Sequence, residues 1–166
     1  MKVMSMRRIT VLVTYYSRTG NTEMMAKAVA EGASKVKDVE VVLKRVEDTS
    51  VEDLLKADAI IIGSPTYYGQ LAWPVKKLID ESVKYHGRLE GKVGAAFTSC
   101  GGLGGGAETT LLSIIKAMLI HGMIIQGNAE EYHYGVVAIG EPDENALEAC
   151  RELGRRVAEL ALKLKA

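Results

Sequence analysis

The sequence has 166 residues, a length that suits one domain spanning residues 1–166 with a sizeable hydrophobic core. Lys and Arg together number 21, as do Asp and Glu, so the formal net charge is about zero. A balanced charge argues against a protein that binds nucleic acid or an anionic membrane surface.

Membrane insertion and secretion are also disfavoured by the sequence. No apolar run reaches the roughly 18 residues that a membrane-spanning helix needs, and residues 1–8 lack the apolar segment and cleavage site of a signal peptide. The two cysteines, Cys100 and Cys150, are too few for a disulfide framework, as is usual in a reducing compartment. We therefore expect a cytoplasmic protein.

Strand-like and helix-like segments alternate along the chain. Apolar and β-branched runs predict strands at residues 8–15, 39–43, 59–63 and 93–98, and a fifth that begins at 123–125, is interrupted, and resumes at 136–139. Apolar residues at helical spacing predict helices at 22–35, 50–57, 74–82, 108–121 and 144–165. The alternation predicts a three-layer α/β fold with a five-stranded parallel sheet of order 2-1-3-4-5, whose ligands bind at the carboxyl ends of the strands.

The loop between the first strand and the first helix is rich in hydroxyl groups. It consists of Ser17, Arg18, Thr19, Gly20, Asn21 and Thr22. A strand that enters a helix through such a loop directs backbone N–H groups and the positive end of the helix dipole at one point, where a phosphate can bind. An ordinary capped helix start without a ligand is the alternative.

The turns after the third and fourth strands should lie beside this loop. The first of them contains Pro65, Thr66, Tyr67, Tyr68 and Gly69, and adjacent aromatic residues can stack on a flat ring. Packing of the two tyrosines on a neighbouring helix is the alternative, and the nearby Trp73 fits the core, an interface or a ring cover equally well.

The second turn, after the fourth strand, is rich in glycine. It contains Ser99, Cys100, Gly101, Gly102, Leu103, Gly104 and Gly105. Such glycine density favours close approach of a ligand or of another backbone segment.

Several familiar motifs fail in the glycine-rich turn after the fourth strand. Residues 102–107 match the dinucleotide fingerprint, but they lie outside the first βα unit and no acidic residue closes the next strand. Ala107 stands where a Walker A loop needs lysine, and Gly106 stands where a cysteine-dependent phosphatase needs arginine. His86 and His133 have no partner at ligand spacing, so we expect no metal site.

Residues 17–22 fit the pattern [ST]-x-T-G-x-T and resemble the phosphate loop of flavodoxins, which holds the phosphate of FMN. The chain as a whole resembles the flavodoxin-like NAD(P)H:quinone oxidoreductases of the WrbA family. The matching segments are residues 15–17, 25–33, 63–69, 91–93, 97–99, 104–106, 108–110, 121–123 and 134–135, and the final helix. The resemblance implies the flavodoxin-like fold and bound FMN, with its phosphate on residues 17–22 and its ring between residues 65–69 and the loop that starts at Ser99.

The same resemblance implies an enzyme that uses NAD(P)H to reduce a small-molecule quinone. Tyr67, Tyr68 and His121 would form the catalytic slot, with His121 supplied by a neighbouring subunit of a homodimer or homotetramer. The alternative for His121 is an ordinary cation or donor at the C-terminal end of the helix that it closes. The chain departs from the WrbA pattern in its flavodoxin-like first loop, in Cys100, and in the short segment 127–133. A flavodoxin-type electron carrier that serves redox protein partners is the alternative, although carriers of that kind are usually acidic.

Overall fold

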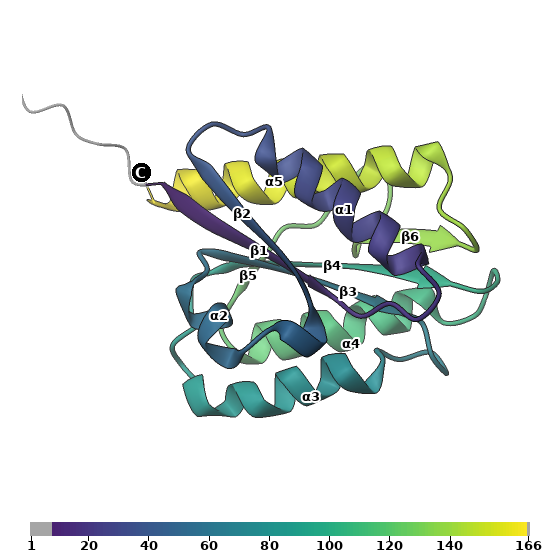
Figure 1. Ribbon diagram of the computed structural model, residues 1–166, viewed down its shortest axis with the longest axis horizontal. Helices are drawn as coiled ribbons and strands as arrows, with labels where there is room; N and C mark the ends of the chain where they lie inside the picture. The colour runs from purple at the N-terminus through teal and green to yellow at the C-terminus, as the bar shows by residue number, and fades with distance from the viewer. Residues whose placement is uncertain (1–7, 166) are drawn as a thin grey trace, which may run out of the picture.

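The computed structural model describes residues 8–165 and contains one parallel β-sheet between two layers of helices (Figure 1). Its strands are β1 (Ile9–Tyr15), β2 (Val39–Arg45), β3 (Ala59–Pro65), β4 (Val93–Cys100), β5 (Ile124–Ile125) and β6 (Val136–Ile139). The strand order is β2-β1-β3-β4-β5, and β6 also pairs with β4. The predicted fold class and the order 2-1-3-4-5 are therefore confirmed.

The fifth position of the sheet is shared by two short strands. Val93 of β4 pairs with Ile124 of β5, and Phe97 pairs with Val136 of β6, so the two strands follow each other along the same edge of β4. Residues 126–135 form an excursion between them. The interrupted fifth strand is therefore confirmed, and β2 lies on the opposite edge of the sheet.

Helices cover both faces of the sheet. They are α1 (Asn21–Ser34), α2 (Val51–Lys56), α3 (Trp73–Glu81), α4 (Ala107–Ile120) and α5 (Glu144–Lys165), with short 3₁₀ turns at Val46–Asp48 and Ser82–Tyr85. Helices α1 and α5 lie on one face, and α2, α3 and α4 lie on the other (Figure 1). Ser50 is the N-cap of α2, and Ser50 and Asp53 form a reciprocal capping box.

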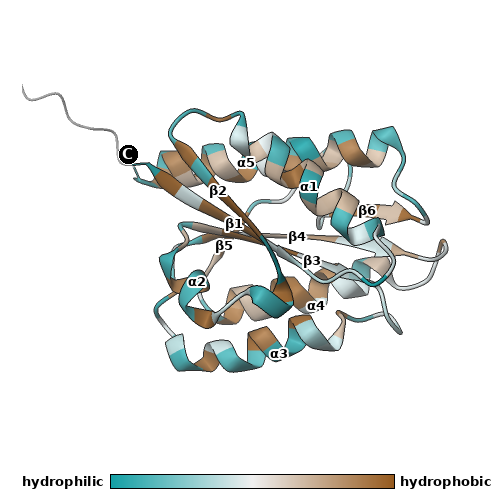
Figure 2. Cartoon of the chain, in the orientation of Figure 1, coloured by the Kyte–Doolittle hydropathy of each residue, from teal (hydrophilic) through white to brown (hydrophobic). Residues whose placement is uncertain are grey.

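Alternating residues of the strands separate two hydrophobic clusters. In β1, Val11 and Val13 point into the cluster beneath α1 and α5, whereas Leu12 between them points into the cluster beneath α2, α3 and α4. The apolar residues of β1 accordingly appear brown in Figure 2. A strand with both faces buried explains why these segments are continuous apolar runs in the sequence.

Three strands extend beyond their predicted ends. Strand β2 continues to Arg45, β3 continues to Pro65, and β4 continues to Cys100. Pro65 pairs in register with Ser99, so Pro65, Ser99 and Cys100 belong to strands and not to loops. The sequence predicts loops at these positions because proline, serine and cysteine interrupt the apolar pattern, yet all three residues are buried. No helix within residues 8–165 is long and apolar enough to cross a membrane.

Candidate functional site

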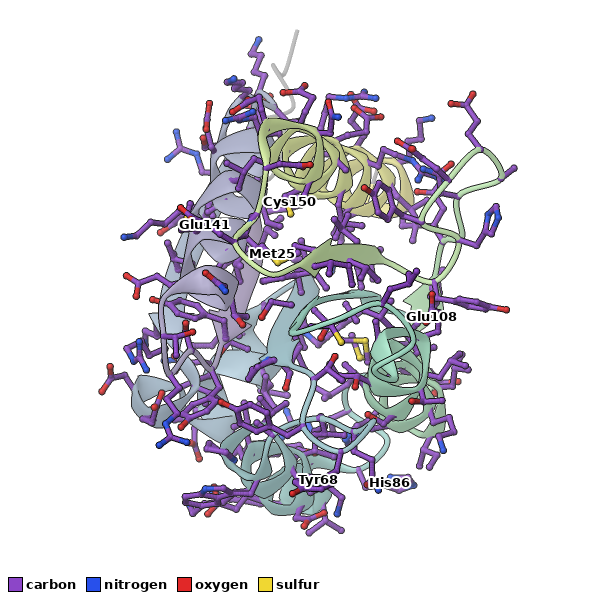
Figure 3. All side chains as sticks on the ribbon, turned by 90° about the vertical axis from the view of Figure 1, so that its right-hand side faces the viewer. Met25, Tyr68, His86, Glu108, Glu141 and Cys150 are labelled. Carbon is purple, nitrogen blue, oxygen red and sulfur yellow. The ribbon has the colours of Figure 1, made fainter. Side chains whose placement is uncertain are left out.

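Three loops meet at the carboxyl edge of the sheet. Tyr15 at the end of β1 pairs with Gly63 in β3, and Pro65 at the end of β3 pairs with Ser99 in β4, so the three strands end side by side. We call the segments that follow them the first loop (residues 16–20), the second loop (residues 66–72) and the third loop (residues 101–106). Figure 3 looks onto this edge, with Tyr68 of the second loop at its lower margin. All predicted site residues except His121 lie on these loops or in the strand ends and first helical turn beside them.

The first loop ends in a helix start that no side chain caps. Gly20 is the N-cap of α1 with a φ of 103°, and its carbonyl accepts the first helical hydrogen bond, from Met24 N at 3.0 Å. The N–H groups of Asn21, Thr22 and Glu23 therefore have no acceptor within the helix. Ser17 Oγ accepts a hydrogen bond from Gly20 N at 3.1 Å and curls the loop toward this point. Free N–H groups at the positive end of a helix dipole fit a phosphate.

The hydroxyl group of Thr22 points to the end of β4. Thr22 Oγ1 lies 2.8 Å from Ser99 Oγ, and both side chains are buried. This hydrogen bond links the start of α1 to the strand that leads into the third loop. A hydroxyl group has one donor and two acceptor positions, so a bond to Ser99 leaves Thr22 one further position. The predicted role of Thr22 as a phosphate ligand stays a prediction.

The second loop is a tight turn that exposes its aromatic residues. Tyr67 N donates to Gln70 O and Gln70 N donates to Tyr67 O, both at 3.0 Å. Tyr68 and Gly69 between them have φ values of 51° and 71°, as in a type I′ turn. The Tyr68 side chain is fully exposed and that of Tyr67 is 40% exposed, so for Tyr68 packing on a neighbouring helix is wrong. Both rings are available to a flat ligand.

Trp73 begins α3 directly after the second loop. Its side chain is 73% exposed, which shows that the core placement, one of three alternatives from the sequence, is wrong. An interface and a ring cover are the two alternatives that an exposed indole leaves.

The third loop touches the second through their backbones. A Cβ atom at Gly106 would lie 2.6 Å from Gly69 Cα, so only glycine allows this approach. The Thr109 hydroxyl lies 2.7 Å from Gly69 O and 2.9 Å from Gly106 O and can donate to either carbonyl. Leu103 is 94% exposed at the tip of the loop. The buried Cys100 thiol donates to Gly102 O at 3.2 Å.

His121 lies at the opposite edge of the sheet. The next residue, Gly122, accepts a hydrogen bond from Gly91 N at 3.0 Å, just before β4 begins. His121 Nε2 lies 2.7 Å from Ser82 Oγ, while Nδ1 is buried and has no hydrogen-bond partner among residues 8–165. Burial, and then the neighbouring His86, lower the pKa of His121. Within one chain His121 is therefore separate from the three loops.

Two residues near the loops carry contacts that sequence analysis missed. Thr109 connects the second and third loops, and Arg45 at the end of β2 donates from Nη2 to Ser17 O at 2.7 Å. The predicted strand ended at residue 43, so Arg45 carried no local signal. Both contacts join segments at least 28 residues apart, and no local pattern encodes them.

Elsewhere on the molecule, a cavity of about 540 Å³ lies between the excursion after β5 and helix α5. Tyr132, His133 and Arg156 are among its lining residues, so it is separate from the three loops. Within residues 8–165 there is no cluster of three or more His, Cys, Asp or Glu side chains that could hold a metal ion.

Comparisons with known proteins agree with this geometry. The family model described as Flavodoxin matches residues 13–163. A flavodoxin from Aquifex aeolicus is 43% identical over 157 residues, which cover 90% of this chain and 85% of that protein. An NAD(P)H dehydrogenase (quinone) from Archaeoglobus fulgidus is 39% identical over 188 aligned positions, covering 93% and 98% of the two chains.

Solved structures give the same result. The crystal structure of a flavodoxin, WrbA-like protein from Agrobacterium tumefaciens superimposes with a TM-score of 0.79 at 32% identity, over 93% of this chain and 98% of that one. The fold of this chain is therefore shared with solved members of one family. The chain belongs to the flavodoxin family, which implies FMN as its cofactor.

Proposed function

We propose that this protein is an FMN-dependent NAD(P)H:quinone oxidoreductase. The observation that carries the proposal is the second loop, whose turn holds Tyr68 fully exposed beside the partly exposed Tyr67 at the edge where FMN would bind. Flat aromatic faces next to a flavin suit flat substrates, as a nicotinamide and a quinone are. The relative from Archaeoglobus fulgidus, matched over 98% of its length, is named for this activity.

The three loops fit the parts of FMN. The phosphate would lie on the free N–H groups at the start of α1, and the ring would lie between the second and third loops. Ser99 and Cys100 at the end of β4 would approach the polar edge of the ring. The chemistry that FMN supplies when bound is two-electron transfer from NAD(P)H to a quinone.

The protein itself binds and orients the substrates. Tyr67 and Tyr68 would wall a slot over one face of the ring that first admits a nicotinamide and later a quinone. Two substrates that use one slot in turn produce ping-pong kinetics. His121 would join this slot only from a second chain, because its own chain places it at the opposite edge of the sheet.

We further propose a cytoplasmic homodimer or homotetramer. Leu119 and Ile120 precede His121 and are 56% and 73% exposed, so His121 lies beside an apolar surface that a second subunit would cover. The proposed partners are thus a second copy of the chain and a small-molecule quinone.

A flavodoxin-type carrier between redox proteins is the second candidate. It is supported by the relative from Aquifex aeolicus, which is named Flavodoxin and is 43% identical. The net charge of about zero counts against it, because an acidic carrier docks on basic partners by charge complementarity.

The deciding experiment mixes the FMN-loaded protein with NADH or NADPH and benzoquinone and follows the absorbance of the reduced nucleotide. Turnover with parallel double-reciprocal lines is expected. Tyr68→Ala should lower kcat/KM for benzoquinone by roughly 2- to 10-fold, the value of one aromatic contact. Tyr134→Ala, which removes an exposed tyrosine away from the three loops, is the matched control. A monomer that a ferredoxin-type protein reduces, but NADH and NADPH do not, would decide for the carrier.

A further inference from the structure

Arg45 occupies a position from which one side chain reaches both the first loop, at Ser17, and the first turn of α1, at Glu23. It is the last residue of β2 and pairs in register with Tyr15, the last residue of β1. Its guanidinium carbon lies 5.6 Å from the centroid of the Tyr15 ring. The register of the two strands thus places a cation beside the point where the chain leaves the sheet and enters the first loop.

The guanidinium group of Arg45 makes three polar contacts. Nη2 donates to Ser17 O at 2.7 Å and lies 3.3 Å from Glu47 Oε1, while Nη1 lies 3.7 Å from Glu23 Oε2. Ser17 stands at the start of the first loop and Glu23 stands in the first turn of α1. The planar fork of arginine allows one side chain to hold groups on both sides of the loop, which a lysine ammonium cannot do with the same geometry.

The contact with Ser17 controls where the polar groups of the loop point. A backbone carbonyl directed at a bound phosphate would repel it. The hydrogen bond from Arg45 keeps the Ser17 carbonyl directed at the guanidinium group instead. The Ser17 hydroxyl accepts from Gly20 N at 3.1 Å, so both polar ends of this residue are fixed. The N–H groups of Asn21, Thr22 and Glu23 are then the groups that the loop presents to an anion.

We infer that Arg45 is a positioning residue for the phosphate of FMN, which it serves by clamping the Ser17 carbonyl to the first turn of α1 without contacting the flavin ring. The inference rests on the proposed FMN site. Arg45 should therefore affect how the phosphate of FMN binds and not how the ring binds, because the ring would lie on the second and third loops.

The test compares FMN with riboflavin, which has the same ring and no phosphate. Apoprotein is titrated with each flavin by calorimetry for the wild type, Arg45→Met, Arg45→Lys and the control Lys44→Met. Lys44 precedes Arg45 on β2 and pairs with Asp53 at 3.0 Å, so its replacement removes one positive charge without touching the first loop. Circular dichroism establishes that each variant is folded.

We expect Arg45→Met to raise the Kd of FMN roughly 10-fold, in line with the loss of a hydrogen bond from a charged group, and to change the Kd of riboflavin less than about twofold. Lys44→Met should change neither Kd, and Arg45→Lys should be intermediate for FMN. Inorganic phosphate should also raise the melting temperature of the wild-type apoprotein more than that of Arg45→Met.

Three results would overturn the inference. The first is an equal loss of affinity for FMN and for riboflavin in Arg45→Met. The second is a change in the Kd of FMN in Lys44→Met as large as that in Arg45→Met. The third is an FMN affinity of Arg45→Lys equal to that of the wild type. If Arg45→Met does not fold, the same comparison between the two flavins is made with Arg45→Lys. The wild-type protein is titrated first, because a wild type that binds neither flavin would refute the proposed function itself.

Discussion

The hydroxyl oxygens of Thr22 and Ser99 lie 2.8 Å apart, although the two residues are 77 positions apart in the sequence. Thr22 belongs to the first turn of α1 and Ser99 to the end of β4, so this hydrogen bond joins the helix start of the candidate site to the strand that leads into the third loop. Both side chains are at most 7% exposed. A buried hydroxyl group that loses its hydrogen-bond partner destabilises the folded state. The pair therefore helps to hold α1 and β4 together at the candidate site.

Thr22→Val removes one hydroxyl group and keeps the shape of the side chain. We expect a loss of about 1–3 kcal/mol in the free energy of unfolding, because the Ser99 hydroxyl would be left buried without its partner. Urea unfolding measures this loss. Ser34→Ala, which removes an exposed hydroxyl at the other end of α1, should cost less than about 0.5 kcal/mol.

A double-mutant cycle checks that the loss comes from the pair. The effects of Thr22→Val and Ser99→Ala should not add, with a coupling energy of roughly 0.5–3 kcal/mol. Additive effects would show that the two hydroxyl groups act independently. FMN affinity measured on the same variants would then show whether Thr22 also serves the phosphate.

The fold could be predicted because its signals are local. Continuous apolar runs mark strands that are buried on both faces, and Ser50 with Asp53 marks the start of α2. The ends of the strands were predicted too short, because register with a neighbouring strand, and not apolar character, keeps Pro65 and Cys100 in the sheet.

The three loops of the site could also be predicted, because each carries an unusual local composition. The contacts that hold the loops in place could not be predicted. Arg45 and Ser17, Thr22 and Ser99, and Thr109 and Gly69 are pairs of residues from separate elements. Their partners are decided by how the strands align, which no spacing within one segment records. The resemblance to WrbA proteins pointed to His121, but only the structure shows that this residue lies at the opposite edge of its own chain.

The pH dependence of stability should reflect His121. Burial, and then His86, lower the pKa of His121 below its ordinary value of 6.5 in the folded chain. The unfolded chain therefore binds the proton more readily than the folded chain, so stability should fall as the pH drops below about 6.5 and continue to fall until the folded-state pKa is passed. Urea midpoints measured between about pH 5 and pH 8 would show this slope.

His121→Gln keeps a donor for the Ser82 hydroxyl and removes the titrating ring, so it should flatten the slope. An unchanged slope in His121→Gln would assign the acid sensitivity to other groups.

Cys100 should prove to be a structural residue of the site and not a nucleophile. Its thiol donates to Gly102 O at 3.2 Å, and a serine hydroxyl can make the same bond. Cys100→Ser should therefore leave the Kd of FMN within about twofold and retain most of the turnover. Covalent chemistry at Cys100 would be revealed by a variant that binds FMN normally and has lost all activity.

Cys150→Ser provides the contrast at a core position. Cys150 is fully buried, and burial raises the pKa of its thiol to about 12. Serine would place a polar hydroxyl group in the cluster beneath α1 and α5, at a cost of roughly 1–3 kcal/mol. We expect this variant to lose stability while FMN affinity in the folded protein is kept.

Gly106 and Gly104 allow the width of the flavin slot to be tested with a matched pair. Both glycines have positive φ, 94° and 76°, so alanine strains the backbone at either position by about 1 kcal/mol or more. A Cβ atom at Gly106 would lie 2.6 Å from Gly69 Cα, whereas a Cβ atom at Gly104 meets nothing within 4 Å. Gly106→Ala should therefore push the second and third loops apart, and Gly104→Ala should not.

The ring of FMN would lie between these loops. Gly106→Ala should therefore raise the Kd of FMN and the Kd of riboflavin equally, by roughly 10-fold or more beyond the effect of Gly104→Ala. This pattern is the opposite of the one expected for Arg45, whose replacement should weaken FMN alone. Calorimetric titration of both variants with both flavins measures it. Equal affinities of Gly106→Ala and Gly104→Ala for riboflavin would mean that the contact between Gly69 and Gly106 does not set the slot that holds the ring.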